Sequence, residues 1–371
     1  GFGKGHSALF SKINNNRTYE IPDSKISRLW YPELKRLLLK TDHDKSRRMT
    51  DASYRELDVK TAKELSLCSL KFIHAYEDGA FNTFRKAKEL GIQCSYELPI
   101  AHWATNRRLL AEEAERYPEW EPTLETTREP EEKLFKKEEE LRLADRITCP
   151  SEFVMESIPA EIRNRVPCQI SPFGSPRNPP LPTPRKREKK QDKSLKTLFV
   201  GSMSQRKGLA DIFEAMKLLK KEPVQLSILG KPSMPMEFYR AQCTNFKYYH
   251  ACTNQGVQQL MKEHDVLVLP SIIEGRALVQ QEALACGIPL IVTPNAGGKD
   301  LIEEGMTGHL VPIRSPEKIA EKIISCLESN LSKLERGIIC QEKARAFSWN
   351  SYAQKIIDFN YSTTSRSIGA S

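Results

Sequence analysis

The sequence predicts an α/β protein with two Rossmann-like, doubly wound domains, and three observations carry this prediction. The chain has 371 residues, enough for two domains that each bury a core of their own. Its second half alternates short β-branched runs with amphipathic segments, as parallel strands covered by helices on both faces do. A proline-rich, basic stretch over residues 176–195 separates the halves. Because proline fixes φ and interrupts both helix and sheet, we expect a stiff linker there.

The second domain is expected over residues 196–346. Its strands are predicted at Thr197–Val200, Gln225–Leu229, Val266–Leu269 and Pro289–Val292. Its helices are predicted at Leu209–Lys220, Gly256–Glu263 and Leu278–Ala285. In such a domain ligands bind beyond the carboxyl ends of the strands, so the residues that follow the strands are the first candidates for a site.

The first domain, expected over residues 1–175, shows the same alternation less regularly. Its strands are predicted at Leu70–Ile73, Cys94–Leu98 and Arg146–Cys149, and its helices at Glu77–Leu90 and Glu131–Ala144. Gly91 stands where a helix C-cap glycine would, and Ser151 is suited to cap a helix. The Pro- and Glu-rich segment Tyr117–Pro130 is interpreted as a surface excursion, and the Ser/Thr-rich tail over 362–371 as disordered.

Composition narrows the class of protein. The nine cysteines are scattered and form no CxxC pair, which predicts reduced thiols in a cytoplasmic protein and neither disulfides nor a zinc site. The net charge of +9 favours anionic ligands or surfaces. Part of the excess lies in the run Arg185–Lys190, which has no interleaved aromatic residues. We interpret this run as a solvated face of the linker, and nucleic acid is the less favoured partner.

A loop with two cations joins the first strand and helix of the second domain. A strand–loop–helix junction offers free backbone N–H groups and the positive end of a helix dipole to an anion. Gly201 opens this loop, and Arg206 and Lys207 close it with a planar fork and a point charge that suit a diphosphate. The loop is neither a Walker loop nor a GxGxxG fingerprint, and alone it also fits a purely structural helix entrance.

Two glutamates, Glu274 and Glu282, follow the predicted strand Val266–Leu269. They are eight positions apart, just over two helical turns, which predicts that they lie near the same helix face. Carboxylates accept hydrogen bonds from vicinal diols, so one could hold a hexose and the other a ribose. The plainer interpretation is a helix-capping Glu and a surface Glu. Their conjunction with the basic loop and with Gly287-Ile288-Pro289 favours a ligand site.

These residues resemble a known family, the retaining glycosyltransferases of family 4, whose GT-B fold has two Rossmann-like domains facing a cleft. The resemblance is clear over Lys196–Leu327 and fainter over Leu70–Phe173. The matching segments are Val200–Gly208, Asp265–Ser271, Glu274-Gly275, Glu282–Pro289, Gly297-Gly298, Gly308 and Phe347–Trp349. The last segment opens a helix, residues 347–361, that crosses back to the N-terminal domain in this fold. The two glutamates with seven residues between them are the most specific mark.

The resemblance implies roles for individual residues. Arg206 and Lys207 would neutralise the donor diphosphate as it leaves, Glu274 would contact sugar hydroxyls, and Glu282 would contact the ribose. The implied donor-binding residues are Gly3, Gly5, Gly201, Arg206, Lys207, Glu274, Arg276, Leu278, Val279 and Glu282. Among them, Leu278 and Val279 would present backbone N–H groups to phosphate.

Two implied positions lie in the first domain. Gly3 and Gly5 would belong to the glycine-rich loop after the first strand, so that strand is expected to be missing from this chain. His102 matches a cleft histidine that contacts the donor sugar and would belong to the catalytic set with Glu274, Arg206 and Lys207. A hydrogen-bonded structural histidine beside Trp103 is an equal alternative.

One departure from the family stands inside the glutamate pair. The family follows its first Glu with Gly, an aromatic residue and another Gly, whereas this chain has Arg276 and Ala277 at the last two places. Alanine permits a less close backbone approach than glycine, and Arg276 is expected to add a phosphate or sugar contact. Donor preference and activity therefore stay open. The alternatives are a nucleotide-sugar epimerase or a non-catalytic nucleotide-sugar-binding subunit on the same fold.

The expected function is that of a hexosyltransferase-type enzyme of the EC 2.4 class, moving a sugar from a nucleotide sugar to an unknown glycan, lipid or small-molecule acceptor. Neither a cofactor nor a metal is expected. Asp42-His43-Asp44 imitates a metal-binding DxD motif, but it follows an apparent helix and predicts a polar loop. The basic amphipathic helix around Ile26–Lys40 fits a core-facing helix better than peripheral contact with the inner membrane face.

Overall fold

The computed structural model describes residues 43–67, 69–124, 129–176 and 194–362. The chain divides into two compact units, residues 1–61 and 62–371. The described part of the first unit belongs to helix α3 (His43–Glu64). His43 and Asp44 stand in the first turn of α3, so the polar loop predicted there is wrong for these two residues. Gly3, Gly5, the Ile26–Lys40 helix, the Arg185–Lys190 run and the tail after Ser362 lie outside the described residues.

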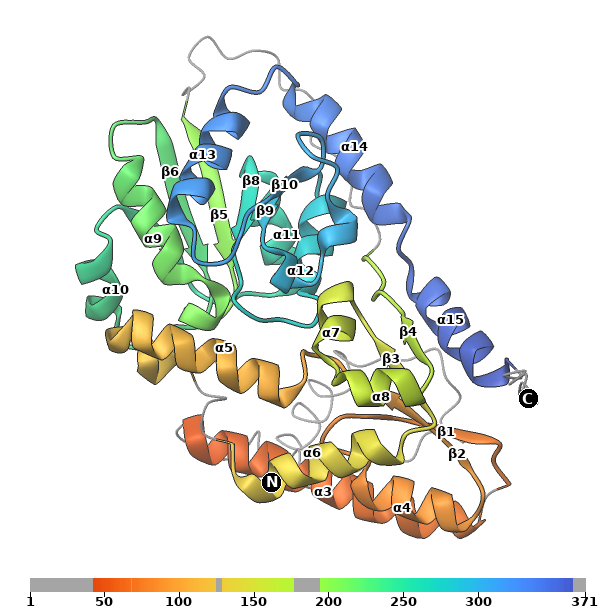
Figure 1. Ribbon diagram of the computed structural model, residues 1–371. Coiled ribbons are helices and arrows are strands. Elements are labelled where there is room, and N and C mark those ends of the chain that lie inside the picture. Colours follow the sequence, from red (N-terminus) through yellow and green to blue (C-terminus); the bar gives the residue numbers. More distant parts are fainter. Residues whose placement is uncertain (1–42, 68, 125–128, 177–193, 363–371) are drawn as a thin grey trace, which may run out of the picture. The chain divides into compact units, whose positions relative to one another are not determined.

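The second unit contains two parallel sheets, each with its own set of helices (Figure 1). The first sheet has the order β1-β2-β3-β4, with strands Phe72–Tyr76, Gln93–Glu97, Arg146–Cys149 and Cys168–Ile170. Its helices are η2 (Leu65–Leu67), α4 (Phe81–Glu89), α5 (Trp103–Arg116), η3 (Pro118–Thr123), α6 (Glu131–Leu143), α7 (Glu152–Ser157) and α8 (Ala160–Arg165). No helix among the described residues is long and apolar enough to cross a membrane.

Local signals in the first sheet largely meet the sequence prediction. Gly91 follows α4 with φ of 70°, the left-handed conformation of a C-cap glycine. The Ser151 hydroxyl accepts a hydrogen bond from the Val154 N–H and caps α7. The helix predicted from Glu77 begins at Phe81, because Asp78 has φ of 71° and breaks the helical path.

The second sheet has the order β10-β9-β8-β5-β6-β7. In chain order its strands are β5 (Leu195–Val200), β6 (Val224–Leu229), β7 (Phe246–Tyr249), β8 (Val266–Leu269), β9 (Leu290–Val292) and β10 (Gly308–Leu310). Its helices are η5 (Gln205–Lys207), α9 (Leu209–Leu218), α10 (Met236–Gln242), α11 (Asn254–Lys262), α12 (Leu278–Ala285), η6 (Pro294–Ala296), η7 (Lys299–Leu301), α13 (Pro316–Leu327), α14 (Lys333–Arg345) and α15 (Trp349–Tyr361).

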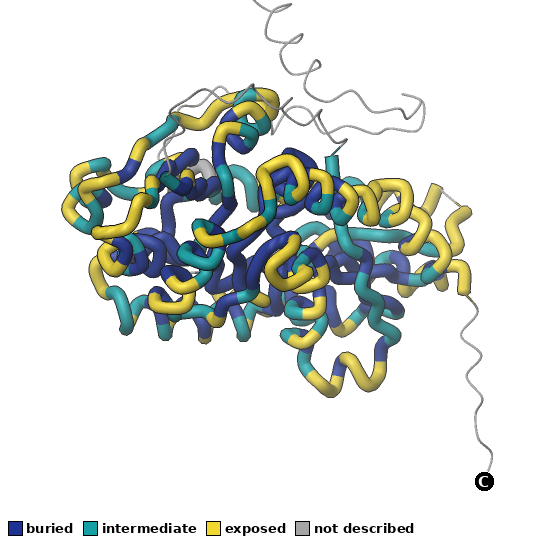
Figure 2. Tube along the Cα trace, turned by 90° about the horizontal axis from the view of Figure 1, so that it is seen from above, coloured by how far each residue is buried: buried dark blue, intermediate teal, exposed yellow. Residues whose placement is uncertain are grey.

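This arrangement confirms the predicted doubly wound fold. Helices α9 and α13 pack together, and α12 packs against α14 and α11, so helices cover both faces of the second sheet (Figure 1). The buried residues follow the strands, while the outer turns of the helices are exposed (Figure 2). The strand order reverses between β5 and β8, and ligands of such sheets bind at the carboxyl ends of the strands beside this reversal.

The interpretation of Tyr117–Pro130 as a surface excursion is wrong for its first half. The Trp120 side chain is 1% exposed and belongs to the core of the second sheet. Its ring lies 4.9 Å from that of Phe238, 5.7 Å from that of Tyr239 and 5.9 Å from that of Phe213. The burial of one aromatic side chain overrides the polar composition of the segment around it. Residues 118–124 therefore pack with the second half of the chain.

Helix α15 runs from the second sheet to the first (Figure 1). Its start is fixed by Ser175, whose backbone N–H donates to the Phe347 carbonyl at 3.0 Å. Farther along, the Tyr352 hydroxyl lies 3.0 Å from that of Tyr76 on β1, and the Lys355 carbonyl accepts from Gln169 on β4. The helix thus joins the two halves of the second unit, as the resemblance implied.

Candidate functional site

The loops after β5 and β8 meet at the carboxyl edge of the second sheet. Gly208, between η5 and α9, has φ of 74°, and a Cβ there would overlap the Pro270 carbonyl at the end of β8. The Ile272 N–H donates to the Arg206 carbonyl at 2.9 Å, which joins the two loops again. Only glycine suits both the conformation and the space at position 208, and this close approach brings the cationic loop onto the loop that carries Glu274.

Arg206 and Lys207 converge on the same carboxylate. Arg206 Nη1 lies 2.6 Å from Glu274 Oε1, and Lys207 Nζ forms an ion pair with that same oxygen. Burial lowers the pKa of Lys207, Glu274 opposes this shift, and Arg206 adds to it. The three side chains carry one net positive charge in a partly buried setting, where electrostatic interactions are stronger than in water. An anionic group of a ligand would balance that charge.

Glu282 stands on α12, apart from the two cations. Burial raises the pKa of its carboxyl, for which the described residues supply no hydrogen bond or ion pair. Glu274 lies in the loop before α12, so the prediction that both glutamates share one helix face is wrong. The cause is the loop itself, because α12 begins only at Leu278. A half-buried carboxylate without a partner is suited to accept hydrogen bonds from ligand hydroxyls.

The first turn of α12 has no side-chain cap. Ala277 is its N-cap residue and offers no hydrogen-bond acceptor in its side chain. The N–H groups of Leu278 and Val279 therefore stand at an uncapped helix start, where the helix dipole favours an anion. Leu278 is exposed and Val279 is half-buried. This is the position in which the resemblance implied a phosphate contact.

Arg276 does not face this edge, contrary to the expected donor contact. Its side chain is 0% exposed and donates to Gln281 Oε1 at 3.0 Å and to the Gly297 carbonyl at 3.1 Å. It also forms a 2.7 Å ion pair with Asp300 and lies over the Phe347 ring, 4.9 Å from its centroid. In this arrangement the guanidinium links α12 to the start of the crossover segment, and its Nη2 is buried without a hydrogen-bond partner among the described residues.

His102 is the N-cap residue of α5. Its Nδ1 accepts from the Ala104 N–H at 3.4 Å, and its Nε2 lies 3.2 Å from Glu138 Oε2. Burial lowers the pKa of the imidazole, and Glu138 opposes the shift. Because Nδ1 accepts a hydrogen bond, the ring proton belongs on Nε2, where it is donated to Glu138. The geometry is that of the structural alternative, and a sugar contact would require Nε2 to exchange Glu138 for a sugar hydroxyl.

Gly275 brings residues from the first sheet against the Glu274 loop. A Cβ at position 275 would overlap the Pro99 carbonyl, and the Ser151 hydroxyl donates to the Gly275 carbonyl at 2.6 Å. The sequence interpretation gave Ser151 a helix-capping role but missed this contact. It also passed over Gln205, the buried residue next to Arg206. No local signal reveals either role, because the partners lie 82 to 124 positions away along the chain.

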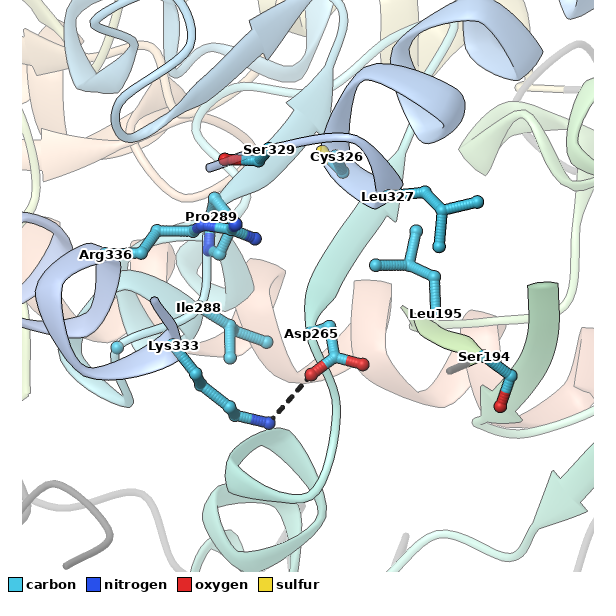
Figure 3. Close-up of a pocket in the computed structure, with 11 residues that line it drawn as sticks. Ser194, Leu195, Asp265, Ile288, Pro289, Cys326, Leu327, Ser329, Lys333 and Arg336 are labelled. Atoms are coloured by element: carbon cyan, nitrogen blue, oxygen red, sulfur yellow. Dashed lines mark hydrogen bonds and ion pairs between the residues drawn. The ribbon is translucent and has the colours of Figure 1, made fainter. Parts of the chain in front are cut away.

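Two cavities differ in their relation to this site. One of about 300 Å³ is lined by Ser151, Asn295, Gly297 and Lys299, among others, on the flank of the Glu274 loop. Another of about 260 Å³ opens where the strands of the second sheet begin, with Lys333 and Arg336 in its wall (Figure 3). In the latter Lys333 pairs with Asp265 at 2.9 Å. That cavity lies at the amino ends of the strands and is separate from the candidate site.

The carboxyl edge of the second sheet is rich in charged side chains of both signs. Across the described ranges of the chain, no three His, Cys, Asp or Glu side chains gather in a group that could hold a metal ion. The charged groups at the carboxyl edge are instead Arg206, Lys207, Glu274 and Glu282. These residues could bind a nucleoside diphosphate directly through cations, N–H groups and carboxylates.

Residues 182–347 match the protein family described as Glycosyl transferases group 1. An uncharacterized glycosyltransferase of Methanocaldococcus jannaschii is 30% identical over 137 residues, 35% of this chain and 35% of that protein. A D-inositol 3-phosphate glycosyltransferase of Corynebacterium glutamicum is 28% identical over 177 residues, 43% of this chain and 41% of that protein. The matched region spans well under half the length of either relative.

Solved structures match over more of the chain. A sucrose-phosphate synthase from Thermosynechococcus elongatus has a TM-score of 0.63 at 18% identity, covering 84% of this chain and 78% of that one. The lipopolysaccharide outer core galactosyltransferase WaaB has a TM-score of 0.58 at 16% identity, covering 84% and 80%. At these identities the likeness concerns the fold alone. Residues 182–347 thus match the glycosyl transferases group 1 domain, and the described part of the chain has the two-sheet α/β fold of the GT-B type.

Proposed function

We propose that this chain is a retaining glycosyltransferase of family 4 that moves a sugar from a nucleotide diphosphate sugar to a glycan, lipid or small-molecule acceptor. One observation carries the proposal, namely the convergence of Arg206 and Lys207 on Glu274 at the carboxyl ends of β5 and β8. A diphosphate would balance the net positive charge of that group. A sugar and a ribose on its two sides would give Glu274 and Glu282 the hydroxyls that carboxylates bind.

In the proposed reaction the bond between the anomeric carbon and the diphosphate breaks while the acceptor oxygen attacks from the same face and its proton passes to a departing phosphate oxygen. Negative charge then grows on the departing phosphate oxygens. Arg206 offers a planar fork of donors and Lys207 a point charge, and both are already held at the edge where this charge develops. Since these fixed cations supply the stabilisation, the proposed reaction requires no metal ion.

The test is an assay with UDP-, GDP-, ADP- and dTDP-sugars, following hydrolysis of the donor and transfer to a panel of sugars, polyols and lipids. Removing one charge-stabilising group typically lowers kcat by about 10²–10³. We expect a loss of this order in Lys207→Ala and in Glu274→Ala. The matched control is Lys217→Ala, because Lys217 is an exposed lysine of α9 that pairs only with neighbouring Glu214 among the described residues.

Other results of this assay would contradict the proposal or favour one of the alternative functions. Undiminished turnover in both site variants would contradict the proposal. Conversion of a nucleotide sugar into its epimer without acceptor, seen by product NMR, would show an epimerase. Nucleotide binding by the wild type without turnover on any acceptor would show a non-catalytic binding subunit. A product with inverted anomeric configuration would agree with sugar transfer but would refute retention.

A further inference from the structure

Gln205 is the residue that connects the cationic loop to the first half of the chain. Its side chain is 0% exposed, and Nε2 donates to Glu113 Oε2 at 2.7 Å and to Asp211 Oδ2 at 2.9 Å. Its Oε1 accepts from the Ala210 N–H at 2.8 Å. Two carboxylates require the NH₂ group and one N–H requires the oxygen, so the orientation of the amide is fixed by its partners.

The two carboxylates are themselves neutralised by arginines. Arg314 forms an ion pair with Glu113 through Nε, and Arg116 pairs with Asp211 at 2.7 Å. Glu113 and Asp211 are both fully buried, so the ion pair with each arginine offsets part of the cost of burying a charge. Arg314 has φ of 59°, an unfavourable conformation for a non-glycine residue that persists only where its surroundings hold it. The cluster is therefore a rigid, charge-balanced unit.

This unit holds both ends of the loop that carries the cations. The Gln205 N–H donates to the Thr123 hydroxyl at 3.1 Å, while the Gln205 side chain holds Ala210 in the first turn of α9. Arg206 and Lys207 lie between these two anchors. The chain that carries them forms only the short turn η5, followed by Gly208. Thr123 and Glu113 come from η3 and α5, which lie beside the loop at the end of the second sheet (Figure 1).

We propose that Gln205, held by Glu113, is a positioning residue that sets the place of Arg206 and Lys207 on the donor diphosphate. This inference rests on the proposed function of that site and adds a contribution from the first half of the chain. Without the hydrogen bonds to Glu113 and Asp211, the loop keeps its charges but loses their fixed placement. Small errors of placement weaken the stabilisation of a developing charge more than they weaken ground-state binding.

The experiment is a double-mutant cycle between Gln205→Met and Lys207→Ala, with kcat and KM measured for the donor that the wild type uses. Methionine retains the length of the side chain and removes its hydrogen bonds. If Gln205 places both cations, Gln205→Met lowers kcat about tenfold in the wild type and by a smaller factor, about threefold or less, in Lys207→Ala, where only Arg206 remains to be placed. The control Gln259→Met changes neither background, because Gln259 is an exposed residue of α11 whose side chain bonds Glu263.

A second set of variants keeps the test decisive if Gln205→Met unfolds. Gln205→Glu places a third carboxylate against Glu113 and Asp211, and Glu113→Gln replaces a charged acceptor of Gln205 by a neutral amide, so each lowers kcat. The exchange of all three residues, Glu113→Gln and Asp211→Asn with Gln205→Glu, reverses these donors and acceptors together, and we expect it to recover kcat by about threefold or more over Gln205→Glu alone. Equal losses of kcat in both Lys207 backgrounds, or no recovery in the exchange, would overturn the positioning role alone. A wild type that neither binds nor turns over any nucleotide sugar would overturn both this inference and the proposed function.

Discussion

The Ser151 hydroxyl donates a 2.6 Å hydrogen bond to the Gly275 carbonyl while it accepts one from the Val154 N–H. One side chain thus caps α7 beside the first sheet and holds the loop after β8 that carries Glu274. Ser151 is buried, so water does not compete for either hydrogen bond. The edge of the second sheet that carries the proposed donor site is therefore held in part by a serine that follows a strand of the first sheet.

Ser151→Ala is expected to affect both stability and donor binding. The variant loses a helix cap, at about 1 kcal/mol, and leaves the Gly275 carbonyl without this partner. We expect KM for the donor to rise about three- to tenfold as the Glu274 loop loosens. Urea unfolding and steady-state kinetics measure the two effects. Ser332→Ala is the matched control, because Ser332 caps α14 through a capping box. The same rise in KM in both variants would refute the special role of Ser151.

Gly275→Ala is expected to destabilise the protein more than an ordinary glycine substitution. A Cβ at position 275 would overlap the Pro99 carbonyl, and a backbone group cannot turn aside as a side chain can. The control is Gly305→Ala, where φ is 76° but the space is open, so only a conformational cost of about 1–2 kcal/mol arises. Urea unfolding should show the larger loss at position 275, together with weaker donor binding. Equal losses would contradict the close approach.

Glu274→Gln is expected to change the pH dependence of donor binding. Burial lowers the pKa of Lys207, and the negative charge of Glu274 opposes that shift. Removing this charge lowers the pKa further, so Lys207 loses its proton at a lower pH. Donor affinity, which requires the charged lysine, should therefore begin to fall at a lower pH on the alkaline side. Calorimetric titrations across pH measure this limb. If Glu274→Gln does not shift the alkaline fall in donor affinity, the electrostatic coupling is contradicted. The control Glu282→Gln should not shift it.

Arg276→Ala is expected to lower stability without weakening the donor contact. The variant removes hydrogen bonds to Gln281 and the Gly297 carbonyl, together with the stacking on Phe347, at a cost of roughly 2–4 kcal/mol. Because the guanidinium is buried away from the donor edge, KM should change less than twofold. Arg345→Ala, an exposed change on α14, serves as the control. A strong rise in KM with unchanged stability would restore the donor contact that the resemblance implied.

Removal of divalent metal ions is expected to leave sugar transfer unchanged. In the proposed mechanism Arg206 and Lys207 supply the positive charge that a metal ion would otherwise bring to the leaving diphosphate. Assays after EDTA treatment, with and without added Mg²⁺ or Mn²⁺, measure this. Loss of activity in EDTA that Mn²⁺ restores would contradict the proposed mechanism.

The sequence predicted the regular elements of the second sheet well because their patterns are local. β8 and α12 have the predicted bounds, since an uninterrupted apolar run and a compact helical segment leave few alternatives. β7 was missed because its segment, Phe246–Tyr249, mixes a lysine with tyrosines and is only partly buried. It is a strand because it pairs with β6, and its own composition gives little indication of this pairing.

The candidate site was predicted as a conjunction of two motifs, and the structure adds the contacts that join them. Neither the ion pairs of Arg206 and Lys207 with Glu274 nor the burial of Arg276 follows from spacing, because both arise where distant loops meet. The glutamate spacing favoured one helix face, yet the loop extends to Ala277 before α12 begins. The start of α12 at Leu278 was itself predicted, so the error lay in applying helical spacing to Glu274, which precedes that start.

The insertion of Trp120 among Phe213, Phe238 and Tyr239 has a consequence for the modularity of this protein. A fragment that begins at the linker would lack Trp120 and would have a cavity among these three aromatic rings. The second half of the chain therefore does not contain its complete core. A chimera that imports the donor half of a relative must carry residues 118–124 along with it. Substitutions of Trp120 and of its aromatic partners are therefore expected to be coupled in their effect on stability, although about a hundred positions of the chain separate them.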